Sequence, residues 1–541
     1  MTAPASFNLI DEPWIRVRTL AGTVEEWSLR TTLAKASEVR GLAGEIPTQD
    51  AALLRLLLAI ILGATRPRYP RTDRENLALF EDWWSSGTLP MTTLDPYLEK
   101  VRDRFDLVHP EAPFYQVAGL STATGEHSGL AKLIADVPDR IPFFSTRSGA
   151  GVASLSLPEA ARWLVHCQAF DPAGIKTGAL GDNRVKQGKG YSLWDPAWAG
   201  TLGLIVLERD SLFETLLLNL PLMMTGPTDL PVWERPPLGP GIDPSHPLPI
   251  GPTDCFTWPS RRLRLFIESD QVRDCQVSNG DKLSPQDLHH VEPMSAWKST
   301  KADARVETSH RIPVRHEADQ RIWQGLAPLL TTASVAGEAP AHSITWLAHL
   351  REAEIMPPDM QVDIRTIGLH YDTNRSKIMG ATDDRLTATV AALTDPVLVQ
   401  AAVDAAAQAS QGVTELANLA SDLDKAAGEH RDPEVRAQVR KQAFEIGYAI
   451  LDSHYRAWIR TLDDPTRVAN SRAAWESTAS ELLRTAGDEL VADASPSALI
   501  GRYLRFTERD KLQLFDAGRA GRRFRFSLAK VFPQPSPTPT R

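Results

Sequence analysis

Apolar positions along this 541-residue chain follow two different patterns, which change near residue 385. Up to about Asp384 the sequence mixes short apolar runs with turn residues and proline-rich stretches, which is typical of an irregular α+β domain. From Asp395 onward the composition becomes that of helices. We therefore predict a mixed α+β N-terminal domain over 1–384, a helical domain over 385–532 and a disordered tail over 533–541.

The helical domain has a repeated signal for the start of a helix, an N-cap acceptor directly before a proline. The four instances are Asp395-Pro396, Asp432-Pro433, Asp464-Pro465 and Ser495-Pro496. The side-chain oxygen of the cap accepts from backbone N–H groups that lack partners, and proline at the first helical position has no N–H to satisfy. Four such starts predict a C-terminal four-helix bundle.

The second of these segments carries an apolar seam with alternating gaps of four and three residues. Its members are Phe444, Tyr448, Leu451, Tyr455, Trp458 and Leu462. Residues at this spacing share one helix face, so we expect the seam to pack against other helices of the bundle. The aromatic residues are interpreted as core rather than as a cofactor site.

Two elements of the N-terminal domain can also be placed. The run Leu53–Ala64 predicts a buried helix that opens at Thr48 and closes near Gly63, and it is too short to cross a bilayer. The stretch Arg262–Leu265 alternates like a strand and is expected to pair with Val272–Val277, followed by a tight turn at Asn279-Gly280.

Composition limits the class of protein. The chain is 42% hydrophobic and 23% charged, which is typical of a globular protein, and its three cysteines, Cys167, Cys255 and Cys275, are too few for a disulfide framework. We expect a reducing cytoplasm and no membrane association. The formal net charge of −9 argues against a chain that holds DNA without partners, because such proteins are usually basic over their contact face.

The search for catalytic motifs gives mostly negative results. Gly188-Lys189-Gly190 resembles part of a phosphate-binding loop, but Asn183 and Gly190 stand where a Walker motif needs Gly and Ser or Thr. No HExxH and no paired-cysteine motif occurs, so we expect no cofactor and no metal. An isolated nucleophile whose partners lie far away in the chain stays open as an alternative, which a nuclease assay with divalent metal would test.

One segment combines flexibility with positive charge. Between Ala173 and Gly190, five glycines alternate with Lys176, Arg184, Lys186 and Lys189. Glycine lets a backbone approach a ligand closely, and the cations suit phosphates. The alternative is a surface loop with ordinary solvated charges, and composition does not separate the two interpretations.

Several collinear segments resemble one family, the CasA large subunits of type I-E CRISPR Cascade complexes. The similar segments are Phe7–Val17, Ala112–Val117, Leu164–Gly178, Glu292–Trp297 and Ile367–Ile378. Each segment is weak alone, and the specific part is their order, which spans nearly the whole chain together with the terminal bundle.

The resemblance implies a non-catalytic protein of antiviral defence. Members of that family work beside a guide RNA (crRNA) and other Cascade subunits, and the guide RNA reads the target by base pairing. The large subunit recognises the protospacer-adjacent motif (PAM) on double-stranded DNA from the minor groove, helps to open the duplex and stabilise the R-loop, and recruits a nuclease-helicase. The alternative is a purely architectural subunit without direct base contacts.

The resemblance also assigns roles to particular residues. The backbone loop that enters the minor groove corresponds to Gly174, Ile175, Lys176, Thr177 and Gly178. A lysine that reaches base acceptors corresponds to Lys282, for which the alternative is a solvated turn lysine.

The wedge beside the PAM corresponds to Asn374, Arg375 and Ser376, where Arg375 departs from the glutamine that the family uses. A loop that contacts the complex corresponds to Phe143, Phe144 and Arg147. Some family members carry clustered cysteines that suggest zinc, and this chain has no such cluster.

Overall fold

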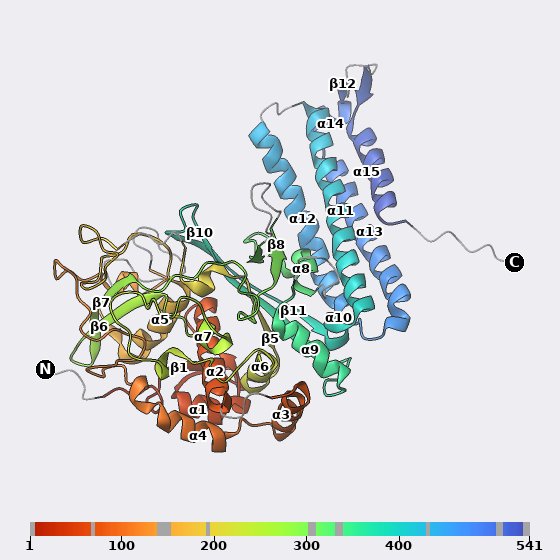
Figure 1. Ribbon diagram of the computed structural model, residues 1–541. Helices are drawn as coiled ribbons and strands as arrows, with labels where there is room; N and C mark the ends of the chain where they lie inside the picture. Colours follow the sequence, from red (N-terminus) through yellow and green to blue (C-terminus); the bar gives the residue numbers. More distant parts are fainter. Residues whose placement is uncertain are drawn as a thin grey trace. The chain divides into compact units, whose positions relative to one another are not determined.

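The computed structural model divides the chain into two compact units (Figure 1). It describes residues 6–66, 71–137, 153–190, 195–300, 310–330, 339–428, 433–504 and 512–533. Unit 1 comprises 1–356 and 362–385, and unit 2 comprises 357–361 and 386–541. The predicted division into independently folding domains over 1–384 and 385–532 stays a prediction.

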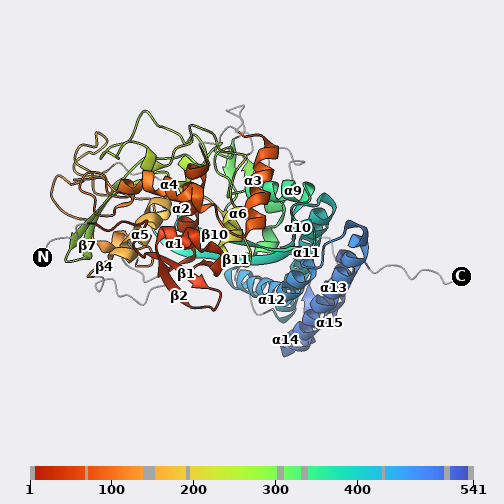
Figure 2. The same ribbon diagram turned by 90° about the horizontal axis from the view of Figure 1, so that it is seen from below.

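Unit 1 mixes short helices with small sheets, so the predicted α+β class is confirmed. Its α-helices are α1 (Leu29–Ala34), α2 (Pro47–Thr65), α3 (Asp73–Ser86), α4 (Met91–Lys100), α5 (Leu157–Phe170), α6 (Leu212–Leu218), α7 (Pro252–Phe256), α8 (Ala327–Leu330) and α9 (His342–Glu352). Helix α2 packs against α4 and α5, as Figure 2 shows.

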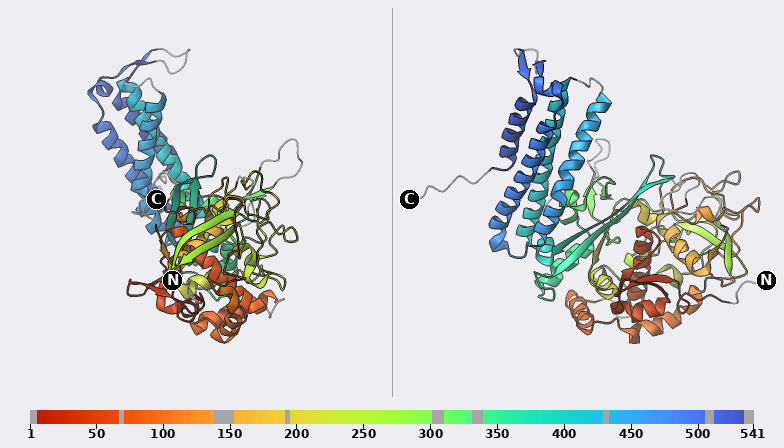
Figure 3. Two further views of the ribbon diagram at one scale, coloured as in Figure 1. Left: turned by 90° about the vertical axis from the view of Figure 1, so that its left-hand side faces the viewer. Right: turned by 180° about the vertical axis from the view of Figure 1, so that it is seen from behind.

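Within the described ranges of unit 1, the strands form four small sheets. The first sheet has the strand order β2 (Val24–Trp27), β1 (Ile15–Thr19), β3 (Val39–Leu42), and the second has the order β4 (Leu155–Ser156), β7 (Gln271–Asn279), β6 (Arg261–Glu268). The third has the order β11 (Ile378–Thr389), β10 (Gln361–Tyr371), β5 (Leu204–Glu208). The fourth pairs β8 (Trp297–Ser299) with β9 (Arg311–Pro313). Strands β10 and β11 form a long hairpin, drawn in teal in Figure 3. Its base residues belong to unit 2.

The predicted β6–β7 pairing is confirmed, with Leu263 opposite Val277, but the predicted turn is misplaced. Asn279 is still in the ladder, and the two strands are joined at Ser269-Asp270, where both residues have positive φ angles of 53° and 63°. Gly280 is needed for a different reason: a Cβ there would lie 2.5 Å from the carbonyl oxygen of Pro259.

The predicted buried helix is confirmed as α2, although it begins at Pro47 and is therefore longer than expected. Proline occupies the first helical turn, and Thr48 instead hydrogen-bonds to Nε2 of His166 at 2.9 Å. By length and composition α2 is long enough to cross a membrane, yet 94% of its apolar window is buried inside the protein. Its apolar surface therefore belongs to the core of unit 1.

Arg55 in the middle of α2 is buried and forms a bidentate ion pair with Glu292 at 2.9 and 2.8 Å. The same carboxylate accepts from Nε1 of Trp198 at 3.0 Å and from the backbone N–H of Met294 at 3.1 Å. These bonds satisfy both charges away from water, which a buried ion pair requires. The segment Glu292–Trp297, noted above for its resemblance, is thus joined to the core helix.

Unit 2 is a four-helix bundle built by α11 (Pro396–Ala427), α12 (Pro433–Ile459), α13 (Val468–Ala492) and α15 (Ala517–Val531). These helices run side by side in Figure 3. Its shorter elements are α10 (Val390–Thr394), α14 (Pro496–Ile500), β12 (Arg502–Leu504) and β13 (Gln513–Phe515). The predicted C-terminal helical bundle is therefore confirmed.

Three of the predicted helix starts are confirmed, but one of them does not open a helix of the bundle. Asp395 caps α11, and Asp464 caps the short 3₁₀ turn that leads into α13. Ser495 caps only the five-residue α14, because Gly501 ends that helix in the left-handed region with a φ of 72°. The fourth bundle helix begins after Asp516, which caps α15. Asp432 and the tail 534–541 lie outside the described residues.

The predicted seam of α12 faces the bundle interior. Leu451, Tyr455, Trp458 and Leu462 are buried, whereas Phe444 and Tyr448 are half-buried. The phenol of Tyr455 donates to the carbonyl oxygen of Ala402 on α11 at 2.8 Å, which satisfies its polar tip inside the core.

We predict that Glu292→Gln lowers the free energy of unfolding by about 3–5 kcal/mol, because it leaves the Arg55 guanidinium buried without a counter-charge. Chemical denaturation of the purified chain, followed by tryptophan fluorescence, measures the loss. The matched control is Glu268→Gln at the exposed end of β6, for which we expect the free energy of unfolding to change by no more than about 0.5 kcal/mol. Equal effects of the two substitutions would contradict the role of the buried pair.

Candidate nucleic-acid interface

Two consecutive arginines open β6 and extend to opposite sides, since neighbouring side chains of a strand alternate. Arg261 is 2% and Arg262 is 1% exposed. Arg261 binds Asp171, which directly follows α5, and Arg262 binds Asp281, which lies two residues after the end of β7. Each arginine therefore fixes the start of one loop that the resemblance singled out.

Asp171 is the anchor of the glycine loop, residues 173–178. Its carboxylate binds both Arg261 and Lys176, whose Nζ lies 2.5 Å from Oδ2. Burial by itself would raise the pKa of Asp171, but the two cations outweigh it and hold that pKa below its usual value. Burial also lowers the pKa of Lys176 despite its pairing with Asp171.

The buried pairing of Lys176 corrects the expectation that its side chain meets phosphate. Its ammonium group is committed to the interior of unit 1, so the loop presents backbone and Ile175 instead. Ile175 is 66% exposed, and Gly174 has a φ of 132°, which side-chain-bearing residues rarely adopt.

The glycine loop is closed by its own hydrogen bonds. The N–H of Gly178 donates to Gly188 at 3.0 Å, and the N–H of Gly190 donates to Lys176 at 2.9 Å. A Cβ on Gly178 would lie 2.5 Å from Cγ1 of Val185. Glycine at this position is therefore required by the packing of the loop itself.

Among the remaining cations of this segment, Arg184 is also committed internally. It pairs with Asp182 and donates to the carbonyl oxygens of Asn279 at 3.0 Å and Gly280 at 3.1 Å. Lys186 and Lys189 are exposed and form no ion pair with any described residue. These two lysines remain available to an anionic ligand.

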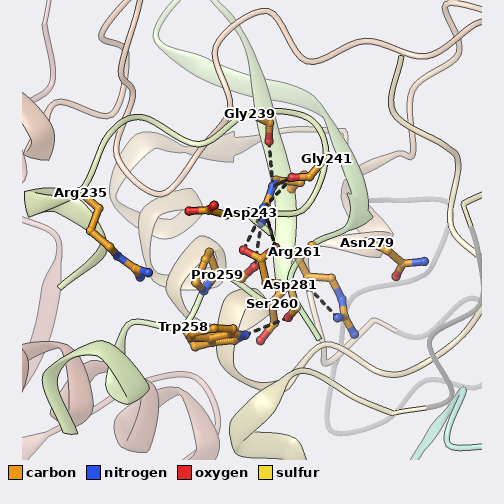
Figure 4. A network of polar contacts seen from close by, with 12 residues as sticks. Arg235, Gly239, Gly241, Asp243, Trp258, Pro259, Ser260, Arg261, Asn279 and Asp281 are labelled. Atoms are coloured by element: carbon orange, nitrogen blue, oxygen red, sulfur yellow. Dashed lines mark hydrogen bonds and ion pairs between the residues drawn. The ribbon is translucent and has the colours of Figure 1, made fainter. Parts of the chain in front are cut away.

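The second arginine organises the turn before Lys282 (Figure 4). Arg262 binds both carboxylate oxygens of Asp281, at 3.0 and 2.9 Å, and donates to the carbonyl oxygens of Gly239 and Gly241. The carbonyl oxygen of Asp281 accepts from Nε1 of Trp258 at 2.9 Å. The residue before Lys282 is thus held on both its backbone and its side chain.

The residues that the resemblance assigned to the wedge lie at the tip of the β10–β11 hairpin. Asp372 closes the tip, since its carboxylate accepts from the N–H of Ser376 at 2.6 Å and of Lys377 at 2.9 Å. Asn374 and Ser376 are exposed. Arg375 has a φ of 55°, and its N–H donates to the carbonyl oxygen of Asp372 at 2.7 Å.

These three loops meet in space although they lie far apart in the sequence. The N–H of Ala173 donates to the carbonyl oxygen of Arg375 at 2.8 Å, so the glycine loop touches the hairpin tip. Asp195 joins the tip to the third loop: Oδ1 binds Nη1 of Arg375 at 2.5 Å, and Oδ2 binds Nζ of Lys282 at 3.2 Å. The sequence-predicted DNA-binding residues therefore form one surface region of unit 1.

Sequence reasoning missed some residues that hold the loops of the candidate interface together. Asp195 belongs to no motif, and Arg261, Arg262 and Asp281 attracted attention only as parts of a strand and turn. The position of Asp281 directly before Lys282 is a signal that in hindsight points to an anchor. Phe143, Phe144 and Arg147 lie outside the described residues.

Burial shifts the pKa values of several potentially reactive side chains of unit 1. Burial raises the pKa of the thiols of Cys167, Cys255 and Cys275, and a thiol kept protonated is a poor nucleophile. Burial also lowers the pKa of His166 to about 3. Within the ranges that the structure describes, no group of three or more potential metal ligands occurs.

Comparison with known proteins gives a consistent result. A family model described as CRISPR-associated protein Cse1 matches residues 8–486. The CRISPR-associated protein CasA/Cse1 of Thermus thermophilus is 34% identical over 332 residues, and this match covers 60% of the chain and 60% of the length of that relative.

Solved structures extend the likeness. The crystal structure of Thermobifida fusca Cse1 shares 37% sequence identity with a TM-score of 0.87, and the match covers 98% of each chain. A chain from a structure described as a CRISPR RNA-guided surveillance complex shares the fold at 19% identity with a TM-score of 0.67, over 97% of this chain and 100% of that one.

We predict that Gly178→Ala disturbs the loop from within, at a cost of about 1–3 kcal/mol, because the added methyl group overlaps Val185. Hydrogen exchange of the amides of Gly178 and Gly190, which the loop protects, should accelerate. Val185→Ala in the same chain should restore slow exchange by making room. Unchanged exchange in Gly178→Ala would show that the loop is not packed as described.

Proposed function

Because the chain belongs to the Cse1 family of CRISPR-associated proteins, we propose that it is the large, non-catalytic subunit of an RNA-guided surveillance complex. In this proposal the subunit recognises the PAM on double-stranded DNA from the minor groove. It then helps to open the duplex and stabilise the R-loop, and it provides the docking site for a nuclease-helicase.

The observation that carries the proposal is the meeting of three loops around Asp195. The glycine loop, Lys282 and the hairpin tip with Arg375 were selected from separate parts of the sequence; in unit 1 the tip contacts the glycine loop through Ala173 and is joined to Lys282 through Asp195. A chance set of solvated loops has no reason to converge. Their convergence supports a single recognition surface.

The roles within this surface follow from what each loop exposes. The minor groove is about 6 Å wide, so it admits the slender backbone near Gly174 more readily than a bulky side chain. Lys282 is a donor facing a groove that offers mostly acceptors, which favours a degenerate code and tolerance of several motifs. We assign Arg375, which lies in the turn at the hairpin tip, to the wedge that stacks on an exposed base plane.

Partners are part of the proposal because the chain is acidic. The 68 acidic residues outnumber the 59 lysines and arginines, so in this proposal guide RNA and neighbouring Cascade subunits share the binding. We place the complex in the cytoplasm, whose reducing conditions suit the three free cysteines. This assembly is supported by a chain of the same fold in a structure described as a CRISPR RNA-guided surveillance complex.

A purely architectural subunit is the alternative. In that case the ion pairs of Asp195 would serve only to hold loops together, and the exposed lysines would be ordinary solvated charges. The two functions differ in one observable, the dependence of DNA binding on the PAM when only this subunit is altered.

We predict that Lys282→Ala weakens binding to the preferred PAM by about 1–3 kcal/mol and flattens the ranking among PAM sequences, because a donor to base acceptors is lost. The measurement is a titration of the assembled complex, with guide RNA, against a panel of duplexes. The matched control is Lys298→Ala, an exposed lysine on β8, for which we expect the ranking to stay unchanged.

If the subunit is purely architectural, Lys282→Ala should change neither the affinity for the preferred PAM nor the ranking among PAM sequences. If Lys282→Ala and Arg375→Ala both leave affinity and PAM ranking as in the wild-type complex, the proposed base contacts are wrong. Copurification of the chain with a guide RNA and other subunits would then still identify it as a structural part of the assembly.

A further inference from the structure

The side chain of Asp195 binds two cations that lie on different loops of the candidate interface. Its oxygens are divided between them, Oδ1 for Arg375 and Oδ2 for Lys282. Its side chain is 16% exposed, whereas those of Lys282 and Arg375 are 43% and 41% exposed. Each cation is therefore held from one side and open to solvent on the other.

We propose that Asp195 is a positioning and specificity-determining residue, an internal anion that occupies Lys282 and Arg375 until nucleic acid replaces it. This inference rests on the proposed function, since it assigns a regulator to the same surface. A carboxylate between two cations resembles, in charge and in acceptor geometry, the phosphate or base acceptors that DNA would offer.

The pairing has two consequences for binding. It fixes the spacing of the two cations before DNA arrives, so less side-chain freedom is lost on binding. It also cancels part of the charge that would attract any duplex, so a DNA sequence must supply acceptors for both cations to displace the carboxylate. Competition of this kind lowers affinity for wrong sequences more than for right ones.

Hydrogen bonds around Lys282 and Arg375 fix their backbones, so the competition between Asp195 and DNA involves only the two side chains. The backbone before Lys282 is fixed by the bonds of Asp281 with Arg262 and Trp258. Arg375 is fixed by the hydrogen bond of its carbonyl oxygen with Ala173. Only the ends of the two cationic side chains are free to exchange partners, and exposed ion pairs are weak enough for such an exchange.

The test compares Asp195→Asn with the wild type in assembled complexes, on duplexes with the preferred PAM and with a scrambled one. Loss of the competing charge should strengthen binding to the scrambled duplex by about tenfold, so that selectivity falls. The salt dependence of binding should steepen by about one unit of log–log slope, because a freed cation now neutralises a phosphate. A residue that only supports the fold would not steepen this slope.

Two variants separate the possible outcomes. Asp195→Glu retains the negative charge, so we expect the salt dependence of its DNA binding to stay at the wild-type slope. This variant keeps the test decisive even if complexes with Asp195→Asn assemble poorly. Glu268→Gln removes one negative charge at the opposite end of β6 and should change neither slope nor selectivity. A steeper slope in Asp195→Glu or in Glu268→Gln would overturn the inference.

The failure of this inference is distinguishable from failure of the proposed function. If Lys282→Ala and Arg375→Ala alter the PAM ranking while Asp195→Asn leaves slope and selectivity unchanged, the surface reads DNA but Asp195 does not regulate it. If the effect of Asp195→Asn persists when Lys282 and Arg375 are both replaced by Ala, it does not act through these cations, and the inference is also wrong.

Discussion

The arrangement of the candidate interface depends on two buried arginines that follow one another in β6. A guanidinium without water must be paired and hydrogen-bonded, and removing its partner from the interior is strongly destabilising. Because the strand turns Arg261 and Arg262 to opposite sides, one reaches Asp171 and the other reaches Asp281. Two loops that are far apart in the chain are thereby fixed to a single short stretch of sheet.

This constraint decides which charges are left for a ligand. Lys176 and Arg184 are attractive candidates in the sequence, yet both are committed to carboxylates of the protein. What the glycine loop offers is backbone and an exposed Ile175, and the segment that follows it adds the exposed Lys186 and Lys189. The loop therefore owes its shape to internal ion pairs and its binding capacity to the groups that those pairs do not use.

Sequence patterns predicted what is encoded locally and missed what depends on distant partners. The seam of α12, the caps Asp395 and Asp464 and the β6–β7 pairing all arise from spacing within short windows. The fourth bundle helix was misplaced because the cap chemistry is the same at Ser495 and Asp516, and only the conformation of Gly501 cuts α14 short. Pairs such as Arg55 with Glu292, separated by 237 positions, leave no local signal at all. The role of Asp195 is of this second kind.

The negative net charge, which argued against DNA binding at the level of composition, acquires a physical meaning at the level of the site. A basic chain would bind every duplex through counterion release, and such affinity carries no sequence information. In this chain Lys176, Arg184, Lys282 and Arg375 near the candidate surface each have a carboxylate partner, which reduces the charge available to attract any duplex. Under the proposed function, affinity then comes from the guide RNA, from partner subunits and from acceptors that fit the exchangeable cations. An acidic subunit with locally paired cations is for this reason better suited to discriminating among DNA sequences than to holding DNA.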